Sequence, residues 1–154
     1  MVEEAVVLIR RGSAAEGARL KEIAVASKGH WGYEPERVRE WADRGDFDRG
    51  TLERLALFVA DAGGRTIAWA SVELRGEVAW LADLWVEPEW IGKGVGTSLF
   101  RQAAEHARET GAHVLEWEAE PNALGFYEKM GARRLRDSTS EWGRMLSVMG
   151  VDLA

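Results

Sequence analysis

Three glycines at alternate positions stand out in the stretch WIGKGVGTSLF, which covers residues 90–100. Gly92, Gly94 and Gly96 follow a strand-like segment that ends at Pro88, and they precede a segment typical of a helix. Backbone without side chains at a helix N-terminus presents unpaired N–H groups to an approaching anion. The stretch therefore favours a phosphate group as its ligand, although a turn chosen only for its conformation would also use glycine.

Two known phosphate-binding patterns differ from this stretch in their spacing. The Walker loop needs GxxxxGK followed by Ser or Thr, whereas Lys93 lies between two of the glycines. The dinucleotide-binding turn needs GxGxxG, and Glu116, at the end of the next strand, stands where that motif has its ribose-binding acid. A Rossmann domain would need several more βα units after Glu116 than the rest of the chain allows. A dinucleotide-binding domain remains a remote alternative.

Acidic side chains in apolar strands are a second source of chemistry. Asp83 lies in the apolar run 77–88, where a buried carboxylate is costly unless it is paired or functional. Glu116 and Glu118 lie on the next predicted strand. When helices cover both faces of a sheet, the alternation of apolar and polar side chains along a strand does not show on which face an acid lies. All three acids therefore remain candidates for a general base.

The segment SKGHWGYEP, residues 27–35, places aromatic side chains in a glycine-bearing loop. His30, Trp31 and Tyr33 could form an aromatic wall or a cation–π cage for an amine. The same rings could instead cover the hydrophobic core. His30 is a fourth candidate proton acceptor.

Turn and capping residues divide the chain into eleven elements that would position these side chains. Ser13 and Pro35 mark helix starts, Gly63 and Gly64 form a hairpin turn, and Gly111 ends a helix. The expected strands are 5–10, 52–62, 65–74, 77–88, 113–120, 132–138 and 145–153, and the expected helices are 13–27, 35–44, 95–110 and 122–130. This order predicts a layered α/β (α+β) fold, and the length of 154 residues predicts a single domain over 1–154.

Composition excludes several classes of function. The chain has no cysteine, which rules out disulfides, thiolate metal sites and a cysteine nucleophile. A net charge of −6 argues against a general nucleic-acid binder. No apolar run approaches the roughly 18 residues that a membrane span needs, and the N-terminus does not resemble a signal peptide. We expect a cytoplasmic protein with no metal and with no nucleic-acid or membrane partner.

Two segments together resemble the GCN5-related N-acetyltransferases (GNAT). The stretch LWVEPEWIGKGVGTSLF resembles their acetyl-coenzyme A signature, Gln/Arg-x-x-Gly-x-Gly/Ala after a strand. PNALGFYEKMGA, residues 121–132, is similar to their N-x-x-x-x-F-Y-x-x-x-G-[FA] segment. The order of elements matches the family from Val6 to Leu153, which implies the acyl-CoA N-acyltransferase fold. That fold has a mixed sheet of six to seven strands with helices on both faces.

The resemblance also implies a reaction and assigns roles to residues. Acetyl-CoA would be the co-substrate, and a primary amine of a small molecule or a protein would be the acceptor. Tyr127 would be the general acid beside the thiol; without that role it is a half-buried ring next to Phe126. The base would be Asp83, Glu116 or Glu118. The implied cofactor contacts are Leu84, Trp85, Val86, Ile91, Gly92, Lys93, Gly94, Val95, Gly96, Thr97, Asn122 and Tyr127, and the implied acceptor contacts are His30, Trp31, Tyr33 and Glu118.

One residue departs from the family pattern. Ile91 occupies the Gln/Arg position, which predicts weaker support of the loop without loss of the cofactor, because the family's contacts there are mostly backbone N–H groups. Asn122 could cap the last helix, hydrogen-bond the pantetheine arm, or do both. A catalytically weak coenzyme A-binding regulatory module is the alternative function, and a homodimer is compatible with the family.

Overall fold

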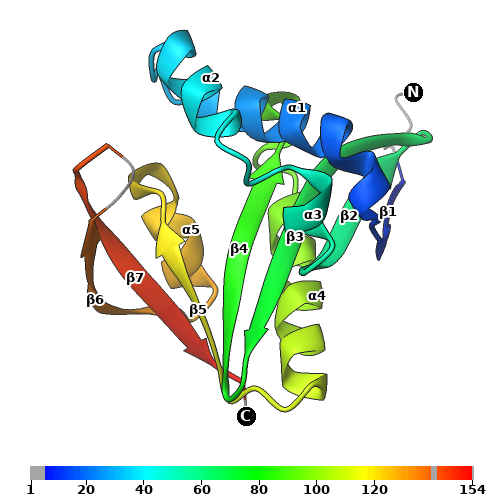
Figure 1. Ribbon diagram of the computed structural model, residues 1–154. Helices are drawn as coiled ribbons and strands as arrows, with labels where there is room; N and C mark the ends of the chain where they lie inside the picture. The colour runs from blue at the N-terminus through cyan, green and yellow to red at the C-terminus, as the bar shows by residue number, and fades with distance from the viewer. Residues whose placement is uncertain (1–5, 140–141, 154) are drawn as a thin grey trace.

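A mixed seven-stranded sheet forms the centre of the protein in a computed structural model that describes residues 6–139 and 142–153 (Figure 1). The strand order is β1-β2-β3-β4-β5-β7-β6. Every neighbouring pair is antiparallel except β4 and β5, which are parallel. The strands are β1 (Val7–Arg11), β2 (Ala56–Ala62), β3 (Arg65–Arg75), β4 (Val78–Val86), β5 (Val114–Ala119), β6 (Arg133–Thr139) and β7 (Met145–Asp152).

Helices cover both faces of the sheet, as the layered prediction required (Figure 1). The helices are α1 (Gly17–Gly29), α2 (Pro35–Ala42), α3 (Arg49–Leu52), α4 (Val95–Glu109) and α5 (Leu124–Lys129), with 3₁₀ turns at Ala14–Glu16, Pro88–Trp90 and Pro121–Ala123. Strand β2 shows the two cores directly. Leu57 and Val59 pack with α1 and α2, whereas Phe58 and Ala60 pack in the core that includes α4. None of the helices in the described ranges has the length and apolar character that crossing a membrane requires.

Most of the predicted turns and caps are confirmed. Ser13 begins the turn into α1 with a capping box: its hydroxyl accepts from the Ala15 N–H, and its own N–H donates to the Glu16 carboxylate at 2.8 Å. Pro35 occupies the start of α2. Gly111 follows the end of α4 with a φ of +97°, a left-handed conformation that glycine adopts without strain.

The predicted strand 52–62 begins too early. Leu52 ends the short helix α3, and the strand starts only at Ala56. Leu52 is fully buried in the core formed with α1 and α2, so its side chain is used by a helical turn rather than by the sheet. The sequence showed an apolar run but did not show where its backbone changes conformation.

Strands β4 and β5 pair over only three residues and then diverge (Figure 1). The pairing joins Val78–Trp80 to Val114–Glu116. Beyond Trp80, the edge of β4 that faces β5 borders an opening. Ser71 of β3 lies opposite Asp83, whereas Val72 lies opposite Leu81, so Ala82 is an extra residue in β4. Such a β-bulge bends a strand and increases its twist. The bulge is therefore one cause of the opening between the two strands.

The bulge also changes the face on which side chains lie. Residues two apart on a regular strand point to the same face. Leu81 packs in the core with α4, but Asp83 pairs with Ser71 and lies on the face that α1 and α2 cover, next to Trp85. The extra residue at Ala82 thus turns the Asp83 carboxylate away from the core that includes α4 and towards the opening.

Candidate functional site

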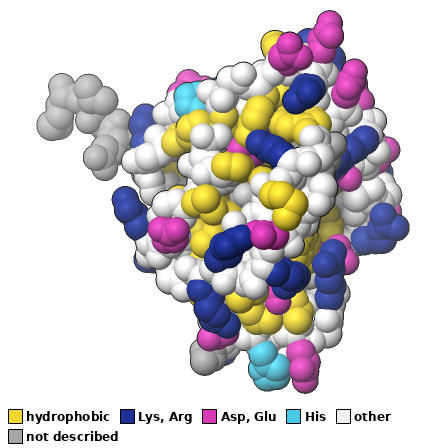
Figure 2. All heavy atoms as spheres, turned by 90° about the vertical axis from the view of Figure 1, so that its left-hand side faces the viewer, with side chains coloured by type: hydrophobic (Ala, Val, Ile, Leu, Met, Phe, Trp, Pro, Cys, Tyr) yellow, Lys and Arg dark blue, Asp and Glu magenta, His cyan; other side chains and the backbone are white. Residues whose placement is uncertain are grey.

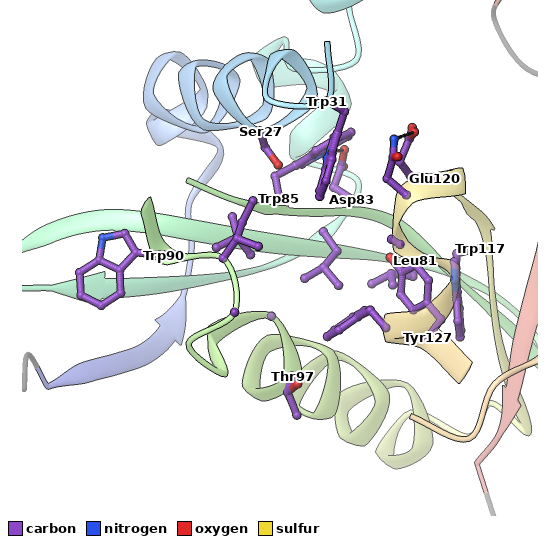
Figure 3. A pocket seen from close by; sticks show the side chains of 18 of the residues that line it. Ser27, Trp31, Leu81, Asp83, Trp85, Trp90, Thr97, Trp117, Glu120 and Tyr127 are labelled. Carbon is purple, nitrogen blue, oxygen red and sulfur yellow. Dashed lines mark hydrogen bonds between the residues drawn. The ribbon is translucent and has the colours of Figure 1, made fainter. Parts of the chain in front are cut away.

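A cavity of about 420 Å³ fills the opening between β4 and β5 (Figure 3). Its walls are the bulged half of β4, the glycine loop with the start of α4, the end of β5, and the segment leading into α5. The lining residues are Ser27, Trp31, Leu81, Ala82, Asp83, Leu84, Trp85, Val86, Trp90, Ile91, Gly92, Gly94, Gly96, Thr97, Trp117, Glu118, Glu120, Asn122, Ala123, Phe126 and Tyr127. The cavity thus brings together most of the residues that the sequence proposed for the cofactor.

The glycine loop forms one end of this cavity. Gly92 and Gly94 have φ values of +81° and +84°, and the space where a Cβ would stand is open at both. Gly94 is also the N-cap of α4 and supplies no side-chain hydrogen bond. The first N–H groups of α4 are therefore accessible to an anion. Gly96 differs, because a Cβ there would lie 3.5 Å from the Phe126 ring, an ordinary van der Waals contact between α4 and α5.

The other side chains of the loop differ in whether they reach the cavity. Lys93 does not line the cavity, and its ammonium lies 5.1 Å from the centre of the Trp90 ring. Val95 is buried in the core. Ile91 is 37 % exposed and lines the cavity. The side chain that departs from the family pattern thus offers only an apolar surface.

Asp83 lines the opening on the side where Trp31 lies (Figure 3). It accepts hydrogen bonds from Ser71 Oγ at 2.6 Å and from Trp85 Nε1 at 3.0 Å. Burial raises the pKa of Asp83 to about 6, and these two neutral donors only partly offset that effect. A carboxylate with such a pKa is ionised at neutral pH but can still accept a proton from a substrate.

Tyr127 extends from α5 into the same cavity (Figure 3). Only 7 % of the residue is exposed, and its ring contacts Trp117, with the ring centres 4.8 Å apart. Burial, followed by the charge of Glu120, raises the pKa of Tyr127 well above its usual value. The phenol therefore stays protonated and can donate a hydrogen bond.

Asn122 does not cap α5, which excludes one of the two roles considered for it. The N-cap position of α5 is Ala123, and the Asn122 amide instead donates to Glu120 Oε1 at 3.1 Å. Glu120 also accepts from the Tyr33 hydroxyl and from Arg144 Nη2. Glu120 was not predicted from the sequence, because its partners Tyr33 and Arg144 lie far from it along the chain.

A second cavity, of about 340 Å³, lies on the side of the sheet that α1 and α2 cover. It meets the first cavity at six shared residues: Leu81, Ala82, Asp83, Trp85, Glu118 and Glu120. Glu118 is exposed and accepts a hydrogen bond from Ser138 Oγ at 3.0 Å. A ligand in the second cavity would therefore meet one in the first at carboxylates carried by β4 and β5.

Lys28 is a further lining residue of the second cavity that the sequence analysis missed. It is only 4 % exposed, and its ammonium lies 4.3 Å from the Trp41 ring centre and 4.7 Å from the Trp142 ring centre. Tyr33 and Trp85 complete the aromatic surroundings. This cage shares only Tyr33 with the predicted cage of His30, Trp31 and Tyr33, and a lysine of the protein itself occupies it.

Three of the residues predicted for catalysis or for the acceptor lie outside the two cavities. Glu116 lines neither, and it pairs with Arg136 at 2.9 Å. His30 lines neither and packs edge-on against Trp31, which lines the first cavity rather than the second. Tyr33 also lines neither, but its hydroxyl donates to Glu120 and accepts from Arg144, and its ring faces Lys28. The geometry thus favours Asp83 over Glu116 or His30 as the proton acceptor.

The arginines of strand β6, which include the Glu116 partner Arg136, lie at an edge of the sheet where acidic side chains neutralise their charge. Arg133 and Arg134 of strand β6 pair with Asp152 and Asp137. Figure 2 shows basic and acidic side chains lying next to one another on this side of the molecule, with apolar side chains between them. The basic residues of β6 are therefore engaged with acids of the same chain. The described residues contain no group of three or more His, Asp or Glu side chains arranged to hold a metal ion.

Comparison with known proteins decides the family. The sequence profile of the acetyltransferase (GNAT) family matches residues 18–132, which include the glycine loop and α5. The chain belongs to this family. The match confirms the resemblance inferred from the two sequence segments.

Relatives of the GNAT family resemble the chain to different extents. An uncharacterized N-acetyltransferase from Methanocaldococcus jannaschii is 29 % identical over 58 % of this chain and 44 % of its own length. The thialysine N-epsilon-acetyltransferase of Bos taurus is 30 % identical over 42 % of this chain and 39 % of its own length. The alignments thus span less than half the length of these curated relatives.

Solved structures of the family confirm the fold over nearly the whole chain. The GCN5-related N-acetyltransferase from Rhodopseudomonas palustris is 26 % identical, has a TM-score of 0.80 and covers 99 % of this chain and 98 % of its own. PaiA N-acetyltransferase from Thermoplasma acidophilum, solved in complex with coenzyme A, is 18 % identical with a TM-score of 0.80, over 96 % of this chain and 99 % of its own.

Proposed function

We propose that the protein is an N-acetyltransferase that moves the acetyl group of acetyl-CoA to a primary amine of a small molecule or a protein. The observation that carries this proposal is the meeting of two cavities at Asp83, one of them ending in the glycine loop. A transfer reaction needs two ligands that approach one point from different sides. Membership of the GNAT family and the coenzyme A bound to PaiA support the choice of ligand.

The first cavity fits a coenzyme A thioester. The open backbone at Gly92 and Gly94 and the N-terminus of α4 suit a pyrophosphate. No strand within residues 6–139 and 142–153 pairs with the β5-facing edge of Leu84–Val86, so its backbone groups can hydrogen-bond an extended arm. Asn122 also lines the cavity; its amide donates one hydrogen bond to Glu120, and an amide has a second N–H and an oxygen with which to bind the same arm. Acetyl-CoA, when bound, supplies the activated acetyl group.

Asp83 is the proposed proton acceptor. Its carboxylate is ionised above a pH of about 6 and would take the proton that an ammonium acceptor must lose before it can act as a nucleophile. Glu118 lines both cavities but is exposed, so it is the weaker candidate. The volume of the second cavity, about 340 Å³, suits a small amine or a single side chain of a protein acceptor.

Tyr127 is the proposed proton donor to the departing thiolate. Because Tyr127→Phe keeps the ring packed against Trp117, the variant should retain the fold and the affinity for coenzyme A. Turnover should fall by at least about tenfold, the low end of the range for general acid catalysis, since water can replace the hydroxyl. Full turnover of the variant with a slow amine, measured where chemistry limits the rate, would show that the hydroxyl is only structural.

Ligand binding tests the proposal before any acceptor is known. In isothermal titration calorimetry we expect coenzyme A and acetyl-CoA to bind one site per chain, with no heat from NAD at the same concentration. Binding of NAD in preference to coenzyme A would favour the dinucleotide-binding alternative instead. Binding of neither would refute the assignment of the first cavity.

A further inference from the structure

We propose that Glu87 is a positioning residue for the glycine loop, held by Arg19 and Arg65. This inference rests on the proposed function, since it takes the loop to be the cofactor site. Glu87 follows the last residue of β4 and precedes the turn Pro88–Trp90, from which the loop continues. Any displacement of this residue is therefore passed on to the backbone of the loop.

The backbone of Glu87 joins the sheet to the turn. Its N–H donates to the Ile67 carbonyl of β3 at 2.9 Å, which extends the β3–β4 pairing by one residue. Its carbonyl accepts from the Trp90 N–H at 2.9 Å, which closes the turn. Glu87 thus belongs to the rigid sheet through one backbone group and to the cofactor loop through the other.

The side chain of Glu87 binds two further elements. The carboxylate is buried, with the residue 4 % exposed, and Oε1 accepts from Arg19 of α1 and from Arg65 of β3, the latter at 2.8 Å. Among the described residues Oε2 is buried without a hydrogen-bond partner. The two arginines therefore supply the compensation that this buried charge requires.

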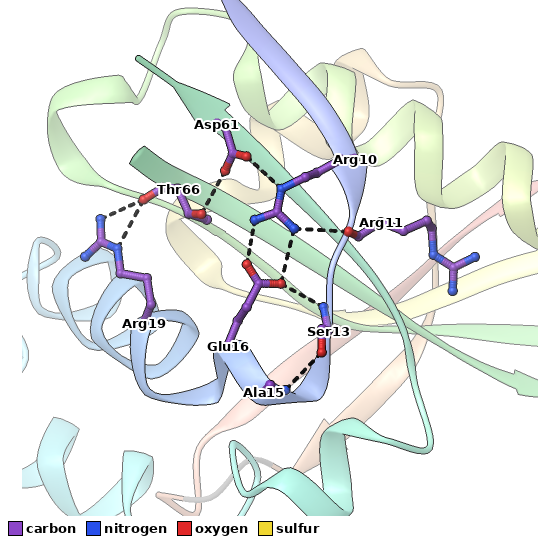
Figure 4. A network of polar contacts seen from close by, with 8 residues as sticks. All are labelled: Arg10, Arg11, Ser13, Ala15, Glu16, Arg19, Asp61 and Thr66. Carbon is purple, nitrogen blue, oxygen red and sulfur yellow. Dashed lines mark hydrogen bonds and ion pairs between the residues drawn. The ribbon is translucent and has the colours of Figure 1, made fainter. Parts of the chain in front are cut away.

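Both arginines have additional contacts that orient them. Arg19 donates to the Thr66 carbonyl through Nε and Nη2, which ties α1 to β3 (Figure 4). Arg65 Nη1 lies 4.0 Å from Glu89, a residue of the turn itself. Ile91, in contrast, has no polar group with which to brace the loop. The ion pairs of Glu87 thus hold the base of the loop in place. They provide the polar support that the side chain of residue 91 cannot give.

Two substitutions test this role through the affinity for coenzyme A. Glu87→Gln keeps the shape of the side chain but removes its charge, and Arg65→Gln removes one partner that is largely exposed and so tolerant of change. Each should raise the Kd for coenzyme A by about tenfold or more, since small displacements of a binding group are costly. The double variant should be no weaker than the worse single variant, because the residues act as one unit. The kcat at saturating acetyl-CoA and the KM for the acceptor should not change.

Glu16→Gln is the matched control. It breaks an ion pair with Arg10 near the start of α1, in the network of Figure 4, and should lower the Tm without changing the Kd. Native Kd values in folded Arg65→Gln and Glu87→Gln would overturn the inference and leave the proposed function intact. An equal rise in Kd for Glu16→Gln would also overturn it, because the effect would then be general destabilisation. Failure of the native protein to bind coenzyme A would refute both proposals.

Discussion

Replacing Asp83 with asparagine is expected to lower kcat/KM for the amine by about 10²–10⁴-fold, the range found when a positioned proton acceptor is removed. Asparagine has nearly the same size, so the contacts with Ser71 and Trp85 can be kept in a rearranged form. The affinity for coenzyme A should not change. Initial rates of thiol release at varied amine concentration measure the effect, and Glu118→Gln is the control, with a smaller loss expected at an exposed carboxylate.

The dependence on pH makes the Asp83 prediction specific. The carboxylate must be ionised to accept a proton, so native kcat/KM should rise with pH through about 6, and this rise should be absent in Asp83→Asn. The stability should move in the opposite direction. Because the folded pKa lies above the unfolded value of 3.8, this group stabilises the fold less as the pH rises from about 4 to about 6. At pH 8 the variant should therefore melt no lower than the native protein. A native pH–rate profile in Asp83→Asn would exclude Asp83 as the base.

Gly94→Val should abolish most of the affinity for coenzyme A. The φ of +84° at Gly94 is strongly unfavourable for a β-branched residue, so the loop must change its conformation and move its N–H groups away from the phosphate position. A displacement of about 1 Å is enough to cost roughly 100-fold. Calorimetry gives the Kd, and thermal melting shows whether the variant is folded.

Gly111→Val is the matched control for the glycine loop. Gly111 also has a positive φ, +97°, with open space around it, but it lies at the opposite end of α4. This variant should lower the Tm and leave the Kd for coenzyme A unchanged. A folded Gly94→Val that binds coenzyme A as tightly as the native protein would contradict the assignment of the loop to phosphate.

The sequence predicted those parts of the fold that depend on local backbone preferences. Pro35 fixes φ at the start of a helix, whereas Gly63, Gly64 and Gly111 permit the positive φ that their turns adopt, and each lies where the structure has the predicted boundary. The glycine loop was found for the same reason. In the candidate site, Asp83 could be named because it interrupts an apolar strand, and Tyr127 could be named because it belongs to a family motif. Each of these signals lies within a single short segment of the sequence.

The rest depended on contacts that no local pattern encodes. Tyr33 and Glu120 are 87 residues apart, and Arg19 and Glu87 are 68 apart, so neither pair can be inferred from spacing. The bulge at Ala82 reverses the alternation of β4 between Leu81 and Asp83, which is why the sequence could not choose the face of the acid. Lys28 enters its aromatic cage only after α1, α2 and β4 have packed together.

Amine-dependent release of coenzyme A from acetyl-CoA tests the central claim most directly. The native protein would be assayed against a panel of small primary amines and lysine-containing peptides, with Asp83→Asn as the background. We predict saturable thiol release with at least one amine, together with acetylation of that amine detected by mass spectrometry, and loss of both in the variant. Tight binding of coenzyme A with no amine-dependent release above the Asp83→Asn background would contradict the claim and indicate a regulatory coenzyme A-binding module.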